Sequence, residues 1–476
     1  METLYTINNN LFYSDIPPYN PSVFYPEIAN YISKDIGINN IYEDIRKIFI
    51  KLELDINNLN KPAWNPLKTF IKKGDHVVLK PNWVFDIRGR KELENSLITH
   101  GSFLRVVLDY VVIALKGSGK ITICDAPLQS ASFEEILAEN NLKDIVNIYK
   151  DIDINIIDLR MEESILDNSM SKIIDKIKLS GDPMGYRTVN LGMDSFLNEL
   201  CQNNADLKFG VGDYDHEITN ENHRLNSHNY YISGSVLDSD VFINLPKLKA
   251  HKKSGITAAL KNLVGINGSK AYLVHFSKVG SSNGDEFPKN NIITKIVGYI
   301  EYKIKPKVPT YIWGIIRKIW SIYKKFKLKN KENKNSSLLS AGGGWYGNDT
   351  IWRMIYDLNS IIFYSDKNGM MQKTQQRKYL SIGDGIISAE GEGPLHGTPV
   401  NSNLIIFGDD PISFDACFAE LINFDVNKIP IISKYKDIKN YKFSDYNNTD
   451  KFQYVVKTND LKPFEPPYGW RNNIEK

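Results

Sequence analysis

Cysteine is scarce in this sequence, with three residues in 476. Cys124, Cys201 and Cys417 lie far apart and no CxxC pair occurs, so neither a zinc ribbon nor an iron–sulfur cluster has its usual ligands. Cys124 and Cys417 stand in apolar runs, which predicts buried thiols of the kind usual in a reducing cytosol. We therefore expect no iron–sulfur cluster in this chain.

A strong excess of one charge is also missing. The formal net charge is +3 and the pI is about 8.3, far from the strongly basic face that nucleic-acid binding usually needs. Apolar residues make up 42% of the chain and charged residues 24%, the balance of a globular protein with a full core. We expect no nucleic-acid partner and one large or two ordinary domains.

Long apolar runs are absent as well. No stretch reaches the roughly 18 apolar residues that a membrane-spanning helix needs. The first residues, METLYTINNNLFY, lack the basic and apolar regions of a signal peptide. The expected location is cytoplasmic.

Short apolar runs alternate with helical patterns along most of the chain. Strands are predicted at residues 76–80, 120–127, 155–159, 241–245, 379–385 and 403–408. Helices are predicted at residues 102–115, 132–141, 255–265 and 412–424. Strands that are apolar throughout and alternate with helices indicate an α/β fold, with a mainly parallel sheet covered by helices on both faces.

The predicted organisation has two lobes built from a discontinuous core. Its parts are an N-terminal extension (1–69), the α/β core (70–300 and 335–460), a basic amphipathic insert (301–334) and a C-terminal tail (461–476). A cleft between the lobes is the expected place for a ligand.

The segment 245–265, LPKLKAHKKSGITAALKNLVG, gathers five lysines and a histidine. It follows the strand at 241–245 and precedes a predicted helix, so it should lie where open α/β sheets bind ligands, near a positive helix end. We predict that a phosphate, carboxylate or nucleotide binds there to Lys247, Lys249, Lys252 and Lys261, and that His251 donates a proton or a hydrogen bond. The alternative is that these lysines solvate a surface loop.

Three other strand ends carry polar residues. Lys80 and Asn82 follow one strand and are predicted to bind substrate, while Asp125 ends a second. Asp384 ends a third, and Glu390 follows in a glycine-rich stretch. We predict that Asp384 and Glu390 act as acid or base, or that Asp125 and Asp384 hold a divalent cation beside the anion. The alternative is that the aspartates cap turns.

The histidines allow two interpretations each. His275 is a candidate substrate ligand, and both His275 and His100 are candidates for proton transfer because imidazole titrates near neutral pH. Either could instead be a structural hydrogen-bond donor. His216, His223 and His228 lack the HExxH spacing of a zinc helix, so a polar loop is favoured there over a metal site.

The lysine segment resembles the central signature of the domain-of-unknown-function 362 family. The matching residues are Pro246, Lys247, Leu248, Lys249, His251, Lys261 and Asn262. VVLKPNW (77–83) resembles its first block, and GDGIISAEGEGPLHGTPV (383–400) and GDDPISFDACFA (408–419) its last two. GNDTIWRMIYDLN (347–359) and GDEFP (284–288) resemble blocks of its longer members.

The resemblance covers residues 70–460 and implies an α/β enzyme, with Asn262 among the substrate-binding residues. Some members carry a ferredoxin-like iron–sulfur module, from which this chain departs because it has no cysteine cluster. The family is also distantly similar to nickel-dependent lactate racemases, which implies proton or hydride chemistry on a small anion.

Residues 310–334, TYIWGIIRKIWSIYKKFKLKNKENK, differ from the rest. Ile312, Ile315, Ile316, Ile319, Ile322, Tyr323 and Phe326 recur at helical spacing, with Trp313 and Trp320 beside them. Eleven lysines and arginines fall between 303 and 334, against one acid. A basic amphipathic helix with tryptophans is typical of membrane interfaces, so 310–326 is predicted to bind the inner face of an anionic membrane. The alternative is an ordinary packed helix.

Together these features predict an enzyme acting on an anionic small molecule or a lipid-linked intermediate. One alternative is a non-catalytic anion-binding or membrane-recruited partner protein, and another is a redox partner that depends on a separate electron carrier. A divalent cation is the one cofactor considered. An oligomer is compatible with the sequence.

Overall fold

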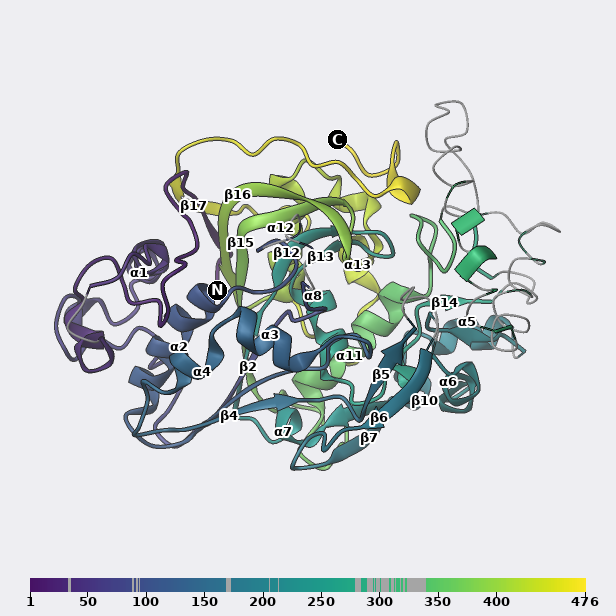
Figure 1. Cartoon of the computed structure of the whole chain (residues 1–476), viewed down its shortest axis with the longest axis horizontal. Helices are drawn as coiled ribbons and strands as arrows, with labels where there is room; N and C mark the ends of the chain where they lie inside the picture. Colours follow the sequence, from purple (N-terminus) through teal and green to yellow (C-terminus); the bar gives the residue numbers. More distant parts are fainter. Residues whose placement is uncertain are drawn as a thin grey trace.

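The structure is a computed structural model of the whole chain. The described residues are 1–32, 36–87, 90, 93, 95–167, 173–204, 206–212, 214–278, 284–288, 294, 296, 300, 308–309, 312, 314–316, 318–319, 322 and 340–476. Figure 1 shows the arrangement of their helices and strands.

A ten-stranded sheet forms the centre of the molecule. Its strands are β1 (Leu4–Ile7), β2 (His76–Pro81), β3 (Lys120–Asp125), β4 (Asp153–Asp158), β11 (Val241–Leu245), β12 (Lys247–His251), β13 (Gly255–Thr257), β15 (Lys378–Glu392), β16 (His396–Gly408) and β17 (Gln453–Lys457). The main order is β17-β1-β16-β15-β11-β2-β3-β4. Neighbours from β15 to β4 are parallel, whereas β16 is antiparallel to both of its neighbours, β15 and β1. The fold is therefore α/β with a mainly parallel sheet, as predicted.

Helices cover both faces of this sheet. One face packs against α1 (Ile41–Lys51), α2 (Gly101–Leu115), α3 (Phe133–Glu139) and α4 (Leu142–Val146). The other packs against α8 (Ala259–Asn262), α11 (Ile351–Tyr364), α12 (Pro411–Leu421) and α13 (Pro430–Ser433). Side chains alternate along β2 as the pleat requires: Val77 and Leu79 join the first core, and Val78 the second. Burial on both faces explains why these strands are apolar throughout.

Smaller elements lie beside the central sheet. Three small sheets contain β7 (Tyr186–Asn190) with β9 (His223–Arg224) and β10 (Ser227–Ser233), β8 (Phe209–Gly210) with β14 (Phe276–Ser277), and β5 (Glu162–Leu166) with β6 (Ile173–Lys178). Short α-helices are α5 (Asn198–Asn203), α6 (His216–Asn222) and α7 (Gly234–Leu237). The 3₁₀ helices are η1 (Pro26–Tyr31), η2 (Ile56–Asn58), η4 (Gly192–Asp194), η5 (Leu263–Ile266), η6 (Lys270–Tyr272), η9 (Val426–Lys428), η10 (Lys434–Asp437) and η11 (Tyr468–Trp470).

Two helix starts follow the local signals in the sequence. The Ser132 side chain accepts a hydrogen bond from the backbone N–H of Glu135 at the start of α3. The Asp410 carboxylate accepts the N–H groups of Ile412 and Ser413 ahead of α12, which begins at Pro411. Short-range capping rules are sufficient at both places.

The prediction for 245–265 was wrong in two respects. Residues 247–251 are a strand, β12, and not a loop, because they pair in parallel with β15 beyond the point where β11 ends. The predicted helix at 255–265 is instead the short strand β13, the single turn α8 and the 3₁₀ helix η5. The strands predicted at 379–385 and 403–408 extend into the longer hairpin β15–β16.

The first 69 residues belong to the central sheet. β1 pairs with β16 on one side and with β17 on the other, and α1 packs against the same core as α2. This segment was expected to be an extension, but it supplies an inner strand. The predicted division into two lobes stays a prediction.

Candidate functional site

The lysine segment is organised by the two-residue repeat of a strand. Leu248 and Ala250 of β12 are buried in apolar surroundings, and Leu248 lies against Gly383 and Gly385, where an added Cβ would meet its side chain. Lys247, Lys249 and His251 are the alternate residues, so they share the other face of β12. All three are buried rather than solvated.

Lys247 is neutralised within the protein. Its ammonium lies 3.2 Å from Oδ2 of Asp384, and both side chains are completely buried. The Tyr13 hydroxyl lies 2.5 Å from the Lys247 Nζ and donates a hydrogen bond to Asp384. The backbone N–H of His100 donates to Oδ2 as well, whereas the Tyr13 hydroxyl donates to Oδ1. Asp384 is therefore held by a lysine, a tyrosine and a backbone amide.

A second lysine–carboxylate pair joins the ends of β2 and β3. The Lys80 ammonium lies 2.7 Å from Oδ1 of Asp125. Asp125 also accepts hydrogen bonds from the backbone N–H groups of Trp83 and Ala126. Gly265 allows this pair to form, because a Cβ there would overlap the Asp125 carboxylate.

Two asparagines connect this pair to Lys249. The Asn262 amide donates to the Lys80 carbonyl, and its oxygen accepts from the Asn82 amide at 2.9 Å. The Asn82 oxygen in turn accepts from the Lys249 ammonium at 3.3 Å. Lys249 also donates to the Leu97 carbonyl at 2.6 Å. The asparagines thus hold Lys249 in place, with no carboxylate hydrogen-bonded to its ammonium among the described residues.

Lys249 and His251 open onto a cavity of about 1250 Å³. Among the described residues, seven lysines line it: Lys208, Lys249, Lys252, Lys253, Lys261, Lys270 and Lys278. The described carboxylates that line it are Asp125, Asp215, Glu217 and Glu392. Asp125 already faces Lys80, and Asp215 and Glu217 are exposed at the start of α6. The buried part of the cavity is consequently cationic.

Three of these lysines have a lowered pKa. Burial is the main cause in each, and it lowers the pKa of Lys261 to about 8 and that of Lys270 to about 7. Burial, with the charges of Lys247 and Lys261, lowers the pKa of Lys249 well below its usual value. The Lys270 ammonium donates to the Ala126 carbonyl at 2.6 Å. An anion in this cavity would stabilise the charged form of all three.

His251 has a fixed orientation of its imidazole. Its Nδ1 lies 3.1 Å from the backbone nitrogen of Lys253 and 3.4 Å from that of Ser254, so it accepts from N–H groups. In the neutral ring the proton is then on Nε2. Burial and four nearby lysines hold the pKa of His251 well below 6.5. His251 therefore presents a neutral N–H donor, so the expected proton donation narrows to hydrogen bonding.

His275 lies beside Lys253 in the same cavity. Its Nδ1 is 3.2 Å from the Lys253 ammonium, and its Nε2 is buried with no hydrogen-bond partner in the part of the chain that is described. Burial and the charges of Lys253, Lys261 and Lys270 lower its pKa well below 6.5. A ligand atom that accepts a hydrogen bond would satisfy that nitrogen.

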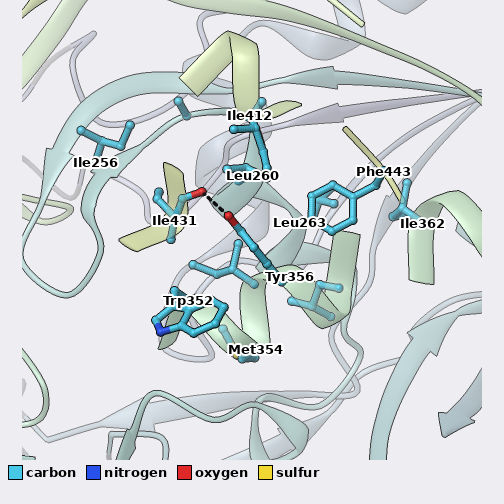
Figure 2. Packing of buried hydrophobic residues seen from close by; sticks show 14 of the residues in the cluster. Ile256, Leu260, Leu263, Trp352, Met354, Tyr356, Ile362, Ile412, Ile431 and Phe443 are labelled. Atoms are coloured by element: carbon cyan, nitrogen blue, oxygen red, sulfur yellow. Dashed lines mark hydrogen bonds between the residues drawn. The ribbon is translucent and has the colours of Figure 1, made fainter. Parts of the chain in front are cut away.

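The short helix α8 carries Lys261 and is held in place by Asp415 of α12. The buried Asp415 carboxylate of α12 accepts the N–H groups of Ala259 and Leu260 at the start of α8. Leu260 and Leu263 pack into the apolar cluster that Figure 2 shows around the Tyr356–Ile431 hydrogen bond. With these neighbours buried, Lys261 is left on the cavity side.

The structure brings together most of the predicted site residues. Those that line the cavity are Asn82, Asp125, Lys249, His251, Lys252, Lys261, Asn262 and His275. Lys80, Lys247, Asp384 and Glu390 are not among the described lining residues. Lys247 and Asp384, which were expected to share one pocket with Lys249, bind each other.

The acidic candidates have structural partners. Glu390 lies on β15 and accepts the backbone N–H of Glu465 at 2.8 Å, which holds the C-terminal tail. Asp125 and Asp384 bind different lysines, so neither presents a free carboxylate to a cation. Within the described residues, no group of three or more His, Cys, Asp or Glu is arranged to hold a metal ion. These side chains do not fit the divalent-cation site that was expected.

The structure also gives the surroundings of the other histidines considered in the sequence. His100 caps α2 through Ser102 and stacks on Tyr13, and burial lowers its pKa to about 3. His223 and His228 are buried beside each other, not in a polar loop. His216 starts α6 and lines the cavity rim.

Lys270 is a buried cavity lysine that sequence reasoning missed, as it also missed Lys208 and Lys278. It stands alone in NGSKAYL, without the clustering that marked the lysine segment. Its small neighbours Gly268 and Ala271 indicate at most that another part of the backbone packs closely there, and they do not indicate a ligand-binding lysine. Only the tertiary structure brings it to the end of β3.

Comparison with known proteins identifies the family. The sequence profile named "Domain of unknown function (DUF362)" matches residues 184–420. The chain belongs to the DUF362 family. The match includes β12, α8 and β15, whereas Lys80, Asn82 and Asp125 lie before it, so the DUF362 signature is confirmed for the central and last blocks of the resemblance.

A solved structure is also similar to this DUF362 chain. It is the crystal structure of a Thermotoga maritima protein from the Northeast Structural Genomics Consortium, with 11% identity and a TM-score of 0.30. The match covers 83% of this chain and 59% of that one, so this chain spans less than two thirds of its length. No curated protein matches.

Proposed function

We propose that this DUF362 protein is an enzyme that binds a small organic anion in the lysine-lined cavity. One observation carries the proposal: the ammonium groups of Lys249, Lys261 and Lys270 converge on one cavity without a carboxylate bonded to any of them among the described residues. Buried charges without partners are costly. A phosphate or carboxylate ligand would supply the missing negative charge.

The enzyme interpretation is favoured over a passive binding protein by the histidines. His251 and His275 line the same cavity as the lysines, and each presents one ring nitrogen without a hydrogen-bond partner in the described part of the chain. Donors held in a fixed orientation stabilise charge that develops on a substrate oxygen. Leu273, Val264 and Ile351 add apolar lining, which suits an organic ligand better than a bare ion.

Calorimetry with inorganic phosphate tests the binding step. We expect Lys249→Met to weaken phosphate binding by roughly tenfold to a hundredfold, the equivalent of about 1.5–3 kcal/mol for a charged hydrogen bond. Lys439→Met, at an exposed position outside the cavity, is the matched control. Equal affinities in all three proteins would exclude this cavity as the anion site, and a co-purified ligand recovered unchanged by native mass spectrometry would favour a passive binding protein.

A second proposal is peripheral membrane binding through the basic insert. Five isoleucines at helical positions are exposed by the following fractions: Ile312 37%, Ile315 58%, Ile316 41%, Ile319 64% and Ile322 68%. Their spacing places them on one side of a helix. Trp313, Trp320 and Phe326 lie outside the described residues. In the part of the chain that is described, no helix is long and apolar enough to cross a bilayer.

Liposome flotation tests this surface. The wild type should float with anionic vesicles, less so at high salt, because each nearby lysine adds roughly 1 kcal/mol of attraction that salt screens. A variant with Ile315, Ile319 and Ile322 changed to Ser should stay at the bottom. If the wild type also stays at the bottom at low salt, the membrane proposal is wrong.

A further inference from the structure

Lys261 is a partly buried cavity lysine that differs from Lys249, Lys253 and Lys270. Lys249 and Lys270 each donate to a backbone carbonyl at 2.6 Å, and Lys253 contacts His275. Lys261 makes no hydrogen bond or ion pair with any residue that the structure describes. Within the described part of the chain, its nitrogen is therefore not engaged by the fold.

Lys261 also occupies a central place among the cavity bases. Its charge acts on the titration of Lys249, His251, Lys270 and His275. These four residues come from β12, η6 and the segment before β14, and all of them line the same cavity as Lys261. A ligand bound at Lys261 would thus share the cavity with both ammonium and imidazole donors.

Such surroundings make an amine nucleophilic. Burial lowers the pKa of Lys261 to about 8. At pH 7.5 about a quarter of this side chain is then the free amine, against about one part in a thousand for an ordinary lysine. A desolvated lysine beside other cations is the arrangement that activates an amine toward carbonyl groups.

We propose that Lys261 is the nucleophile of the cavity and forms an imine with an aldehyde or ketone that also carries a phosphate or carboxylate. This rests on the anion site proposed above. Lys249 and Lys270 hold the anionic group. The free amine of Lys261 adds to the carbonyl carbon, a carbon–nitrogen bond forms, and the carbonyl oxygen leaves as water after taking up the two amine protons. The Nε2–H of His251 donates to that oxygen as it gains charge.

Pyridoxal phosphate is a suitable probe because it combines an aldehyde with a phosphate. The full-length protein is mixed with one equivalent of the probe and reduced with borohydride, and the modified lysine is located by peptide mass spectrometry. We expect one main adduct, on Lys261, that inorganic phosphate suppresses. Pyridoxal, which lacks the phosphate, should give much less of it.

Variants separate this inference from the anion site. Lys261→Arg keeps the charge and should still bind inorganic phosphate by calorimetry, which also reports that the fold is intact, but it should lose the adduct. Lys439→Arg should keep the adduct. Phosphate binding in the wild type with no adduct, or with adducts spread evenly over surface lysines, would overturn the role of Lys261 alone. Absence of both phosphate binding and adduct would overturn the proposed function as well.

Discussion

Two groups of buried lysines lie within one small region and serve different purposes. Lys80 and Lys247 each face a carboxylate, Asp125 and Asp384, and these pairs are enclosed by further hydrogen bonds. Lys249 is also completely buried and Lys261 is partly buried, but both face a cavity and no hydrogen-bonded carboxylate among the described residues. The comparison teaches that burial of a cation is informative only together with its partner: a paired lysine supports the fold, and an unpaired one is the ground on which we propose a ligand.

Breaking a paired lysine should have the largest effect. Asp384→Ala leaves the Lys247 ammonium buried and uncompensated, so we expect the free energy of unfolding to fall by about 3–5 kcal/mol. Urea unfolding followed by fluorescence measures this. The double variant Lys247→Met, Asp384→Leu should recover a large part of the loss, since it removes both charges. A loss in the double variant as large as in Asp384→Ala would show that the ion pair is not the cause.

The buried histidines His223 and His228 should make the stability of the protein depend on pH. Burial lowers the pKa of His223 to about 4 and that of His228 to about 3. An unfolded histidine titrates near 6.5, so between about pH 6.5 and 4 the unfolded state binds more protons than the folded state. The free energy of unfolding therefore decreases as the pH is lowered through this range, and it keeps its full value above pH 6.5. At pH 5 each imidazole should cost about 2 kcal/mol relative to pH 7.

The variant His228→Leu checks the origin of this pH dependence. Both ring nitrogens of His228 lack hydrogen-bond partners among the residues described, and the side chain is completely buried, so an apolar replacement is tolerable. Urea unfolding at pH 7 and pH 5 should show a smaller difference for the variant than for the wild type. Identical differences would mean that other groups cause the acid sensitivity.

Removing an unpaired lysine should have the smallest effect on stability. Lys249 is completely buried, and not the surface lysine that a solvated loop would contain. In Lys249→Met the loss of its hydrogen bonds is offset by removal of a desolvation penalty. We expect the free energy of unfolding to change by at most about 1 kcal/mol, in contrast to Asp384→Ala. A loss near that of Asp384→Ala would assign Lys249 to the fold.

How much of the fold and of the site could be predicted depends on how far apart in the sequence the interacting residues are. The alternation of apolar strands and helices, the caps at Ser132 and Asp410, and the buried Cys124 and Cys417 all follow from local pattern, and the structure contains them. The cationic character of the site follows from the lysine segment. These features depend on neighbours within a few residues, which the sequence displays directly.

Only the tertiary structure decided which charges neutralise one another. Asp384 lies 137 positions after Lys247 and Asp125 lies 45 positions after Lys80 in the sequence, yet each pair is in contact. Pairing across such separations depends on strand order and register, which no local pattern encodes. The sequence by itself determined an α/β protein with a concentration of lysines near strand ends. The packing of β12 along β15 then divided those lysines into structural pairs and an open cavity, because a buried charge must be placed beside a partner or beside space for one.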